Sequence, residues 1–252
     1  MSSFIDETKN VLLPGFDCNR LSSSNFKCIE SDTPQKCILV LGMNPAGNAK
    51  VAKEDEKALY LYCLPEYSID GRTYSKYYKP IFEVFDRATN NNAKWGWCSY
   101  PRDRFEELIE DDNKLKPHKQ ALMKQYGNLK DKEYSIYIGE LFYYHMTSQT
   151  ELLKLIDSSK RTVHVQKMLQ WHIDAINETN NSVSLIYINN TTASRMICLA
   201  LDIEGYPTFY DYEYNGKIYR ILFGSMLSGK SPMDVFSRGR LISEIQQYLQ
   251  IG

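Results

Sequence analysis

The residues best placed to do chemistry in this sequence belong to the hexapeptide Gly-Met-Asn-Pro-Ala-Gly at positions 42–47, which follows the apolar run 37–41. An uninterrupted apolar run is typical of a buried strand, which holds the loop after it rigidly. Pro45 keeps Asn44 out of the helical region, and the glycines Gly42 and Gly47 let the backbone approach a ligand closely. Asn44 is therefore the residue that this loop would present to a ligand. The alternative interpretation is a tight turn with no chemical role.

A second polar loop, Gly139-Glu140-Leu141-Phe142, follows the strand predicted at 133–138. Glu140 either faces a ligand or is simply an exposed residue at a strand end, and both interpretations are open. His145 follows this loop and is the histidine best placed to donate a proton, although a buried structural role is the alternative. The loop therefore adds a carboxylate and an imidazole to the residues that can take part in a reaction.

A third loop, Gly-Ser-Met-Leu-Ser-Gly-Lys at 224–230, follows the second arm of a hairpin marked by Asn-Gly at 215–216. Its serine hydroxyls and backbone amides can bind a phosphate group. Lys230, Arg238 and Arg240 add positive charge to this end of the chain. A solvated basic face with no ligand is the alternative.

The elements needed to position these loops alternate between strands and helices. The pattern predicts strands at 37–41, 133–138, 184–188, 208–214 and 217–222, and helices at 74–85, 104–109, 149–156, 162–178, 192–199 and 234–249, with a partly helical stretch at 49–64 and a short helix at 6–12. Such alternation indicates an α/β fold, here a three-layer α/β/α sandwich with a largely parallel central sheet. We expect one domain at 35–252, preceded by an N-terminal arm at 1–34 that wraps around it.

Composition excludes several classes of protein. The chain has 252 residues and a net charge of −1, so no global attraction to a polyanion is expected, although a local basic site is compatible with it. It has no apolar run long enough for a membrane span and no signal peptide, which predicts a cytoplasmic protein. Its six cysteines form no C-x-x-C pair, so we expect no disulfide framework and no metal. No nucleotide-binding or serine-hydrolase motif occurs, and no cofactor is expected.

The loops at 42–47 and 224–229, in this order and followed by an apolar closing helix, resemble those of the uracil-DNA glycosylase superfamily, in particular its mismatch-specific and single-strand-selective branches. The resemblance spans about residues 38–249 but rests on short motifs. It implies a monomeric DNA-binding enzyme that hydrolyses the N-glycosidic bond of a flipped damaged or mismatched base, without metal or cofactor.

The resemblance also implies roles for individual residues. Asn44, with Gly42, Met43, Pro45 and Gly47 around it, would position the attacking water. Glu140 and Phe142 would contact the flipped base, and Tyr78 would stack on it unless that tyrosine packs in the core. Ser225 would support catalysis beside His145. The residues that would contact DNA are Leu227 as an apolar wedge, Ser228, Gly229, Lys230 and Arg240.

Two departures from the family pattern affect these expectations. Glu140 stands where the family typically has an asparagine, and a carboxylate that only accepts hydrogen bonds suits an amino-bearing edge such as that of cytosine or adenine, unless burial protonates it. Phe223 stands where the family commonly has a histidine that supports the leaving base. A non-catalytic nucleic-acid-binding relative and a small-molecule nucleoside or nucleotide hydrolase are therefore the alternative functions.

Overall fold

The structure, a computed structural model, describes residues 3–23, 25–31, 33–45, 49, 68–69, 72–73, 75–113, 115–227 and 232–250. Within these ranges, six strands form the main sheet in the order β4-β5-β1-β6-β8-β7. Every neighbouring pair is parallel except β7 and β8. The strands are β1 (Gln35–Gly42), β4 (Ala93–Trp95), β5 (Tyr134–Glu140), β6 (Asn181–Ile188), β7 (Phe209–Tyr214) and β8 (Lys217–Phe223).

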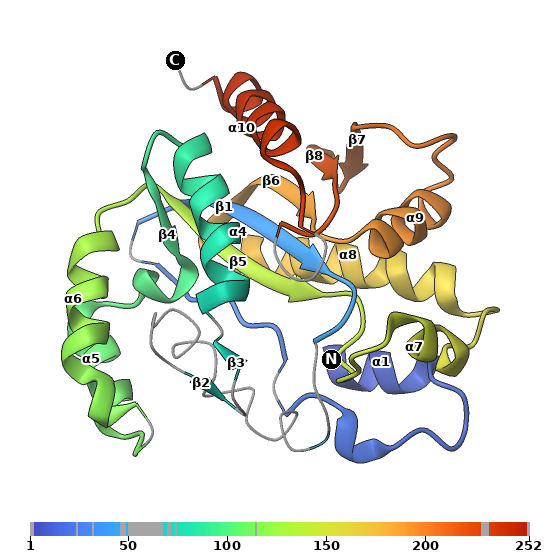
Figure 1. Cartoon of the computed structure of the whole chain (residues 1–252), viewed down its shortest axis with the longest axis horizontal. Coiled ribbons are helices and arrows are strands. Elements are labelled where there is room, and N and C mark those ends of the chain that lie inside the picture. Colours follow the sequence, from blue (N-terminus) through green and yellow to red (C-terminus); the bar gives the residue numbers. More distant parts are fainter. Residues whose placement is uncertain are drawn as a thin grey trace.

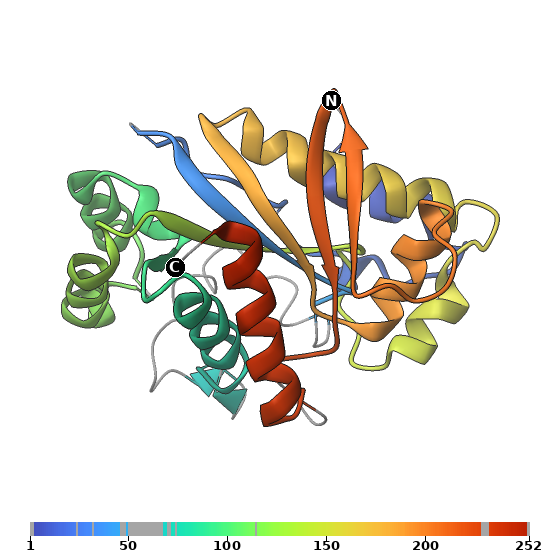
Figure 2. The ribbon, with the colours of Figure 1, turned by 90° about the horizontal axis from the view of Figure 1, so that it is seen from above.

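Helices lie on both faces of this sheet (Figures 1 and 2). One face is covered by α1 (Phe4–Val11), α8 (Arg161–Asn177) and α9 (Thr191–Ala200), and the other by α4 (Ser75–Ala88), α5 (Arg102–Glu110), α6 (Lys119–Leu129) and α10 (Val235–Leu249). The remaining elements of the described ranges are α7 (Gln149–Leu155), three short 3-10 helices (Cys18–Arg20, Gly96–Ser99 and Lys116–His118) and a small separate pair, β2 (Ser68–Ile69) and β3 (Arg72–Thr73). The predicted α/β fold with a largely parallel sheet is confirmed, and this arrangement is compatible with three layers. None of the helices in the described ranges is long and apolar enough to cross a bilayer.

The apolar run of β1 contributes to two cores at once. Successive side chains of a strand point to opposite faces, so Cys37, Leu39 and Leu41 pack against α1, α8 and α9. Ile38 and Val40 pack against α4 and α10 on the other face. All five side chains are at most 1% exposed, which explains why the run shows no alternation of polar and apolar residues.

Local sequence signals account for the boundaries of several elements. Asn215 and Gly216 adopt positive φ angles of 50° and 71°, which a two-residue hairpin turn between β7 and β8 requires. Asp234 caps α10 by accepting hydrogen bonds from two backbone amides. The helix expected at 6–12 runs from Phe4 to Val11 because Ser3 and Asp6 form a capping box at its start. The helical stretch predicted at 49–64 lies almost entirely outside the described residues.

The order of the strands fixes where loops can cooperate. After β1 the chain forms β4 and β5 on one side of it, and then crosses to form β6 and β8 on the other side. The direction of winding therefore reverses at β1. In open α/β sheets, ligands bind beside the carboxyl ends of the strands at such a reversal. The loops after β5, β1 and β6 are consequently the ones that can share a site.

Candidate active site

Asn44 lies just after β1 and is held by the loop that follows β5. Its Nδ2 donates to the backbone carbonyls of Met146 at 2.8 Å, Tyr144 at 3.2 Å and Pro45 at 3.0 Å. Carbonyl oxygens only accept hydrogen bonds, so the amide nitrogen must face them and Oδ1 must point away from them. The half-buried side chain therefore presents a fixed hydrogen-bond acceptor at the end of β1.

Glu140 is the last residue of β5 and is paired in register with Gly42 of β1. Both carboxylate oxygens of Glu140 lie in the space that a side chain at position 42 would occupy. Glycine at 42 is thus required for the half-buried carboxylate to lie over the end of β1. Since Asn44 follows two residues later, the structure brings an amide acceptor and a carboxylate to the same strand end.

The loop after β5 is attached to β1 and also to the N-terminal segment. Leu141 and Phe142 donate their backbone amides to the carbonyls of Gly42 and Met43 at 3.1 and 3.0 Å. On its other side, the Tyr143 amide donates to the buried Thr8 hydroxyl at 2.9 Å, and Leu21 forms an antiparallel bridge with Tyr144. Sequence reasoning found nothing functional in residues 1–34. The structure shows that this segment supports the loop that holds Asn44.

Two residues expected to contact the substrate are buried instead. His145 is 1% exposed, and its backbone amide donates to the carbonyl of Arg20 at 2.7 Å while its own carbonyl accepts from the Arg20 guanidinium. Phe142 is fully buried and stacks on His164, with ring centroids 4.8 Å apart. The expectations that His145 donates a proton to a ligand and that Phe142 contacts a base are therefore corrected. The loop directs both side chains into the protein because its backbone is bonded on both edges.

The carboxyl end of β6 contributes two asparagines for which the sequence alone predicts no role. Asn190 caps α9 through hydrogen bonds from the amides of Thr192 and Ala193. Asn189 is 3% exposed. Its backbone amide donates to the Leu41 carbonyl at 2.8 Å, and its side-chain Oδ1 accepts from the Leu227 backbone amide at 2.8 Å. Asn189 thus ties the loop after β8 to the end of β1. The only sequence signal for this is the run of polar residues at 189–192 directly after a buried strand.

Replacing Asn189 with alanine is expected to lower the free energy of unfolding by about 1–3 kcal/mol, because the buried Leu227 amide would lose its acceptor. Urea unfolding measures this as a lower midpoint with an unchanged slope. Asn177→Ala is the matched control, since it removes a hydrogen bond between two side chains, from Asn177 of α8 to the Tyr219 hydroxyl of β8, and deprives no buried backbone amide of its acceptor. Equal midpoints for the two variants would show that Asn189 is not a structural tie.

The loop after β8 is described as far as Leu227. Ser225 is half-buried; its carbonyl accepts from the Tyr187 hydroxyl at 2.8 Å, and Gly224 leaves the space that this tyrosine needs. Ser225 lies two strands away from β1, and its predicted catalytic role stays a prediction. Leu227 is fully buried. Its predicted role as a wedge in the base stack is corrected, since a wedge requires an exposed side chain.

Other residues predicted for the site have mixed outcomes. The Tyr78 ring packs edge-on against Trp95, with centroids 6.2 Å apart, in agreement with core packing and not with a free stacking surface. Arg240 is exposed on α10, where its guanidinium donates to the Ser237 hydroxyl at 3.2 Å. Gly47, Ser228, Gly229 and Lys230 lie outside the described residues.

Two buried histidines lie beneath the loop after β5. His172 is fully buried; its Nδ1 lies 2.6 Å from the Met168 carbonyl, and its Nε2 lies 3.0 Å from the Tyr143 hydroxyl. The carbonyl accepts only, so Nδ1 carries the proton and Nε2 accepts from Tyr143. Burial lowers the pKa of His172 to about 4. Burial also lowers the pKa of His164, whose Nε2 bonds to the Leu141 carbonyl. Both imidazoles therefore act as neutral structural groups.

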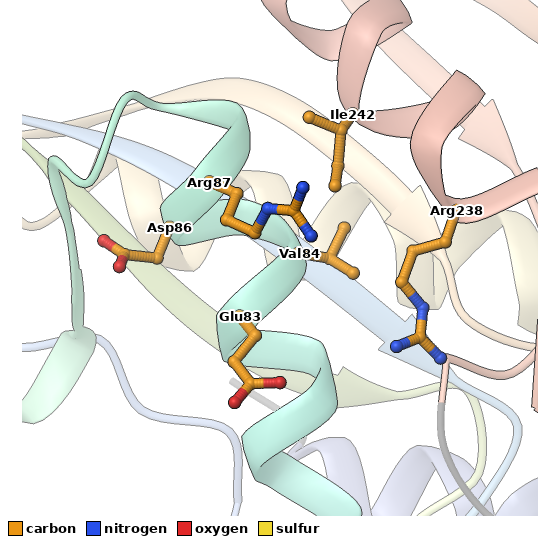
Figure 3. A pocket seen from close by; sticks show the side chains of 6 residues that line it. All are labelled: Glu83, Val84, Asp86, Arg87, Arg238 and Ile242. Atoms are coloured by element: carbon orange, nitrogen blue, oxygen red, sulfur yellow. The ribbon is translucent and has the colours of Figure 1, made fainter. Parts of the chain in front are cut away.

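A cavity of about 300 Å³ lies between α4 and α10 (Figure 3). It is lined by Glu83, Val84, Asp86, Arg87, Arg238 and Ile242. Acidic and basic side chains are equally represented in this lining, and none of the six residues belongs to a loop at the carboxyl edge of the sheet. We therefore assign the candidate site to the strand ends and not to this cavity.

The structure thus brings Asn44, Gly42 and Glu140 together at the reversal point of the sheet, with Ser225 on a loop tied to the same edge through Asn189. It does not bring His145, Phe142 or Leu227 to the surface of that site. No family model, no curated protein and no solved structure matches this chain.

Proposed function

We propose that this chain is a DNA base-excision glycosylase that hydrolyses the N-glycosidic bond of a flipped damaged or mismatched base, acting as a monomer in the cytoplasm. The observation that supports it best is the fixed orientation of Asn44, whose amide nitrogen is held by three carbonyls so that Oδ1 is presented at the reversal point of the sheet. Glu140 adds a carboxylate at the same strand end. This combination suits a reaction that needs an oriented water and a group that reads a base.

In the proposed reaction a water oxygen bonds to the anomeric carbon of the sugar while the bond from that carbon to the base nitrogen breaks. The departing base takes the bonding electron pair and a proton, and the other product is an abasic sugar. Asn44 Oδ1 accepts a hydrogen bond from the attacking water and so orients it, although the amide cannot remove its proton as a strong base would. The sugar carries positive charge in the transition state, and the carboxylate of Glu140 favours that charge electrostatically.

Glu140 also gives the proposal a substrate preference. An ionised carboxylate accepts hydrogen bonds and cannot donate them, so it pairs with an exocyclic amino group and is repelled by a carbonyl. We therefore propose that bases with an amino edge, such as modified cytosine or adenine, are released in preference to uracil.

The test uses end-labelled oligonucleotides, single-stranded and duplex, that carry uracil, hypoxanthine, xanthine, a G·T mismatch or a modified cytosine or adenine. Abasic product is detected by strand cleavage in alkali. We expect release of an amino-bearing base about tenfold or more faster than release of uracil, and Glu140→Gln is expected to reduce or reverse this ratio because an amide both donates and accepts. Absence of abasic product from every substrate would rule out the glycosylase proposal.

A non-catalytic nucleic-acid-binding protein is the second candidate, and two observations favour it. Phe223 offers no proton donor to a leaving base, and the nearest histidine in the candidate loop, His145, is buried. Binding to DNA that weakens steeply as salt rises, without any base release, would support this candidate. A small-molecule nucleoside hydrolase, by contrast, would keep its activity when Lys230 and Arg240 are replaced by glutamate.

A further inference from the structure

The cavity between α4 and α10 combines an apolar surface with two positive charges. Its apolar part consists of Val84, which is 1% exposed, and Ile242, which is 8% exposed, one from each helix. Arg87 of α4 and Arg238 of α10 also line the cavity. Figure 3 shows their guanidinium groups in the space between the helices, on either side of Val84. An anion that enters this space therefore meets both arginines.

The two carboxylates of the lining are engaged elsewhere. Asp86 Oδ1 accepts a hydrogen bond from the Ala93 backbone amide at 3.3 Å, at the start of β4. Figure 3 shows the Asp86 carboxylate on the side of α4 turned away from α10. Glu83 Oε1 lies 3.7 Å from Lys79 Nζ, one turn earlier on α4, and its side chain is 52% exposed to water. The equal number of acidic and basic residues thus does not make the cavity neutral where a ligand can enter.

Both arginines keep hydrogen-bond donors that no described residue uses. Arg238 Nη2 donates to the carbonyls of Leu227 and Met233 at 3.4 Å, but its buried Nε has no acceptor in the described part of the chain. The Arg87 guanidinium forms no hydrogen bond or ion pair with any described residue. A buried donor without an acceptor is uncommon and indicates a missing partner. The bonds from Nη2 also hold Arg238 in place, which reduces the entropy lost when a ligand binds.

The chemistry of the lining indicates the class of ligand. Guanidinium groups donate pairs of charge-assisted hydrogen bonds to phosphate and carboxylate oxygens. A phosphomonoester carries close to two negative charges at neutral pH, which matches two arginines, whereas a carboxylate or a phosphodiester carries one. The volume of about 300 Å³ is at the lower end of the range for small-molecule pockets. These properties together fit a small organic phosphate.

We propose that this cavity binds a small phosphomonoester, with the phosphate held by Arg87 and Arg238 and the organic part of the ligand against Val84 and Ile242. The site is separate from the strand ends, and the inference does not rest on the proposed function.

Binding at this site should also join α4 and α10 more firmly. Gln246 of α10 already connects the two helices, since its Nε2 donates to the Arg87 carbonyl at 3.4 Å and to Asn90 Oδ1 at 3.2 Å. A ligand held by Arg87 and Arg238 adds a connection nearer to the loop after β8. Because such a ligand binds the folded chain, it should raise the Tm as its concentration rises.

The experiment is a calorimetric titration of the full chain with phenyl phosphate, phenyl sulfate and inorganic phosphate at about pH 8, where the phosphates are dianions. Phenyl phosphate is expected to bind about tenfold more tightly than phenyl sulfate, which carries one charge. It is also expected to bind more tightly than inorganic phosphate, which has no apolar group to place against Val84 and Ile242.

The variants test the two arginines one at a time. Arg87→Ala is expected to weaken phenyl phosphate binding about tenfold or more without affecting the fold, because this guanidinium bonds to no described residue. Arg238→Ala should weaken binding similarly, with thermal unfolding as a check because its bonds to two carbonyls are lost. Arg195→Ala is the matched control, since it removes an exposed positive charge from α9, on the opposite face of the sheet, and should leave the affinity unchanged.

The inference fails if no probe binds at millimolar concentrations, or if Arg87→Ala binds phenyl phosphate as tightly as the wild type does. An equal loss in Arg195→Ala would show only a general attraction to positive charge. Displacement of phenyl phosphate by a duplex oligonucleotide without terminal phosphates would assign the two arginines to the DNA backbone and not to a small ligand. None of these results depends on base release, so the glycosylase proposal stands or fails separately.

Discussion

Replacing Asn44 with alanine is expected to lower the rate of base release about 100- to 1,000-fold while the protein remains folded. The loss is large because the side chain has two tasks: Oδ1 orients the water, and Nδ2 holds the carbonyls of Tyr144 and Met146 in place. The fold is expected to survive because the backbone bond from the Met146 amide to the Pro45 carbonyl, at 3.1 Å, still joins the two loops. Single-turnover kinetics on the best oligonucleotide, with circular dichroism as a check on folding, measure the effect.

Two further variants separate these tasks. Arg20→Ala loosens the same loop from its other side by removing a bond to the His145 carbonyl, but it leaves Asn44 intact, so less than about a tenfold loss is expected. Asn44→Asp places a carboxylate against three carbonyl oxygens and is expected to be as inactive as the alanine variant. If Arg20→Ala were as inactive as Asn44→Ala, holding the loop would be the only role of Asn44.

Lowering the pH from roughly 6.5 to 4 is expected to reduce the free energy of unfolding by about 3 kcal/mol. Burial lowers the pKa of His172 from 6.5 to about 4, so in this window the unfolded chain binds a proton that the folded chain does not. Stability then rises with pH and is lost as the pH falls, with a slope of about 1.4 kcal/mol per pH unit for one proton. The lowered pKa of His164 adds a contribution of the same sign. Surface carboxylates with lowered pKa values, such as Asp211 beside Arg220, affect the free energy of unfolding only at pH values below this window.

His172→Phe tests this assignment. The ring keeps its place among Phe4 and Phe26 but no longer titrates, so the slope of stability against pH should fall by about one proton even though the hydrogen bond from Tyr143 is lost. Phe4→Leu is the control, because it disturbs the same cluster while the imidazole remains, and its slope should equal that of the wild type. An unchanged slope for His172→Phe would assign the acid sensitivity to other groups.

The strands and helices were predictable where the signal is local. The apolar run at 37–41, the Asn-Gly turn at 215–216 and the closing helix at 234–249 each depend on signals between neighbouring residues, and the structure confirms all three. Glu140 was predictable as a strand-end residue. Its contact with Gly42 was not, since it depends on the register of two parallel strands that lie about a hundred residues apart.

The predictions for some site residues were wrong because the surroundings of those residues come from distant parts of the chain. Leu227 has the pattern of an exposed loop residue, but Asn189 binds its amide and draws it into the core. His145 follows a polar loop, yet the segment around Arg20 covers it. Such contacts are invisible to periodicity.

The attachment of the N-terminal segment to the loop after β5 has a consequence for how the protein is made. The Thr8 hydroxyl and the Tyr143 amide that binds it are separated by 135 residues, and Arg20 is separated by 125 residues from the His145 carbonyl that it holds. During synthesis, Thr8 and Arg20 leave the ribosome several seconds before Tyr143 and His145 have been added to the chain. Contacts of such long range also carry the largest loop-closure cost. We therefore expect the loop that orients Asn44 to be among the last parts to become ordered. The apolar side chains of α1 should remain exposed, and able to bind a chaperone, until β5 has been synthesised.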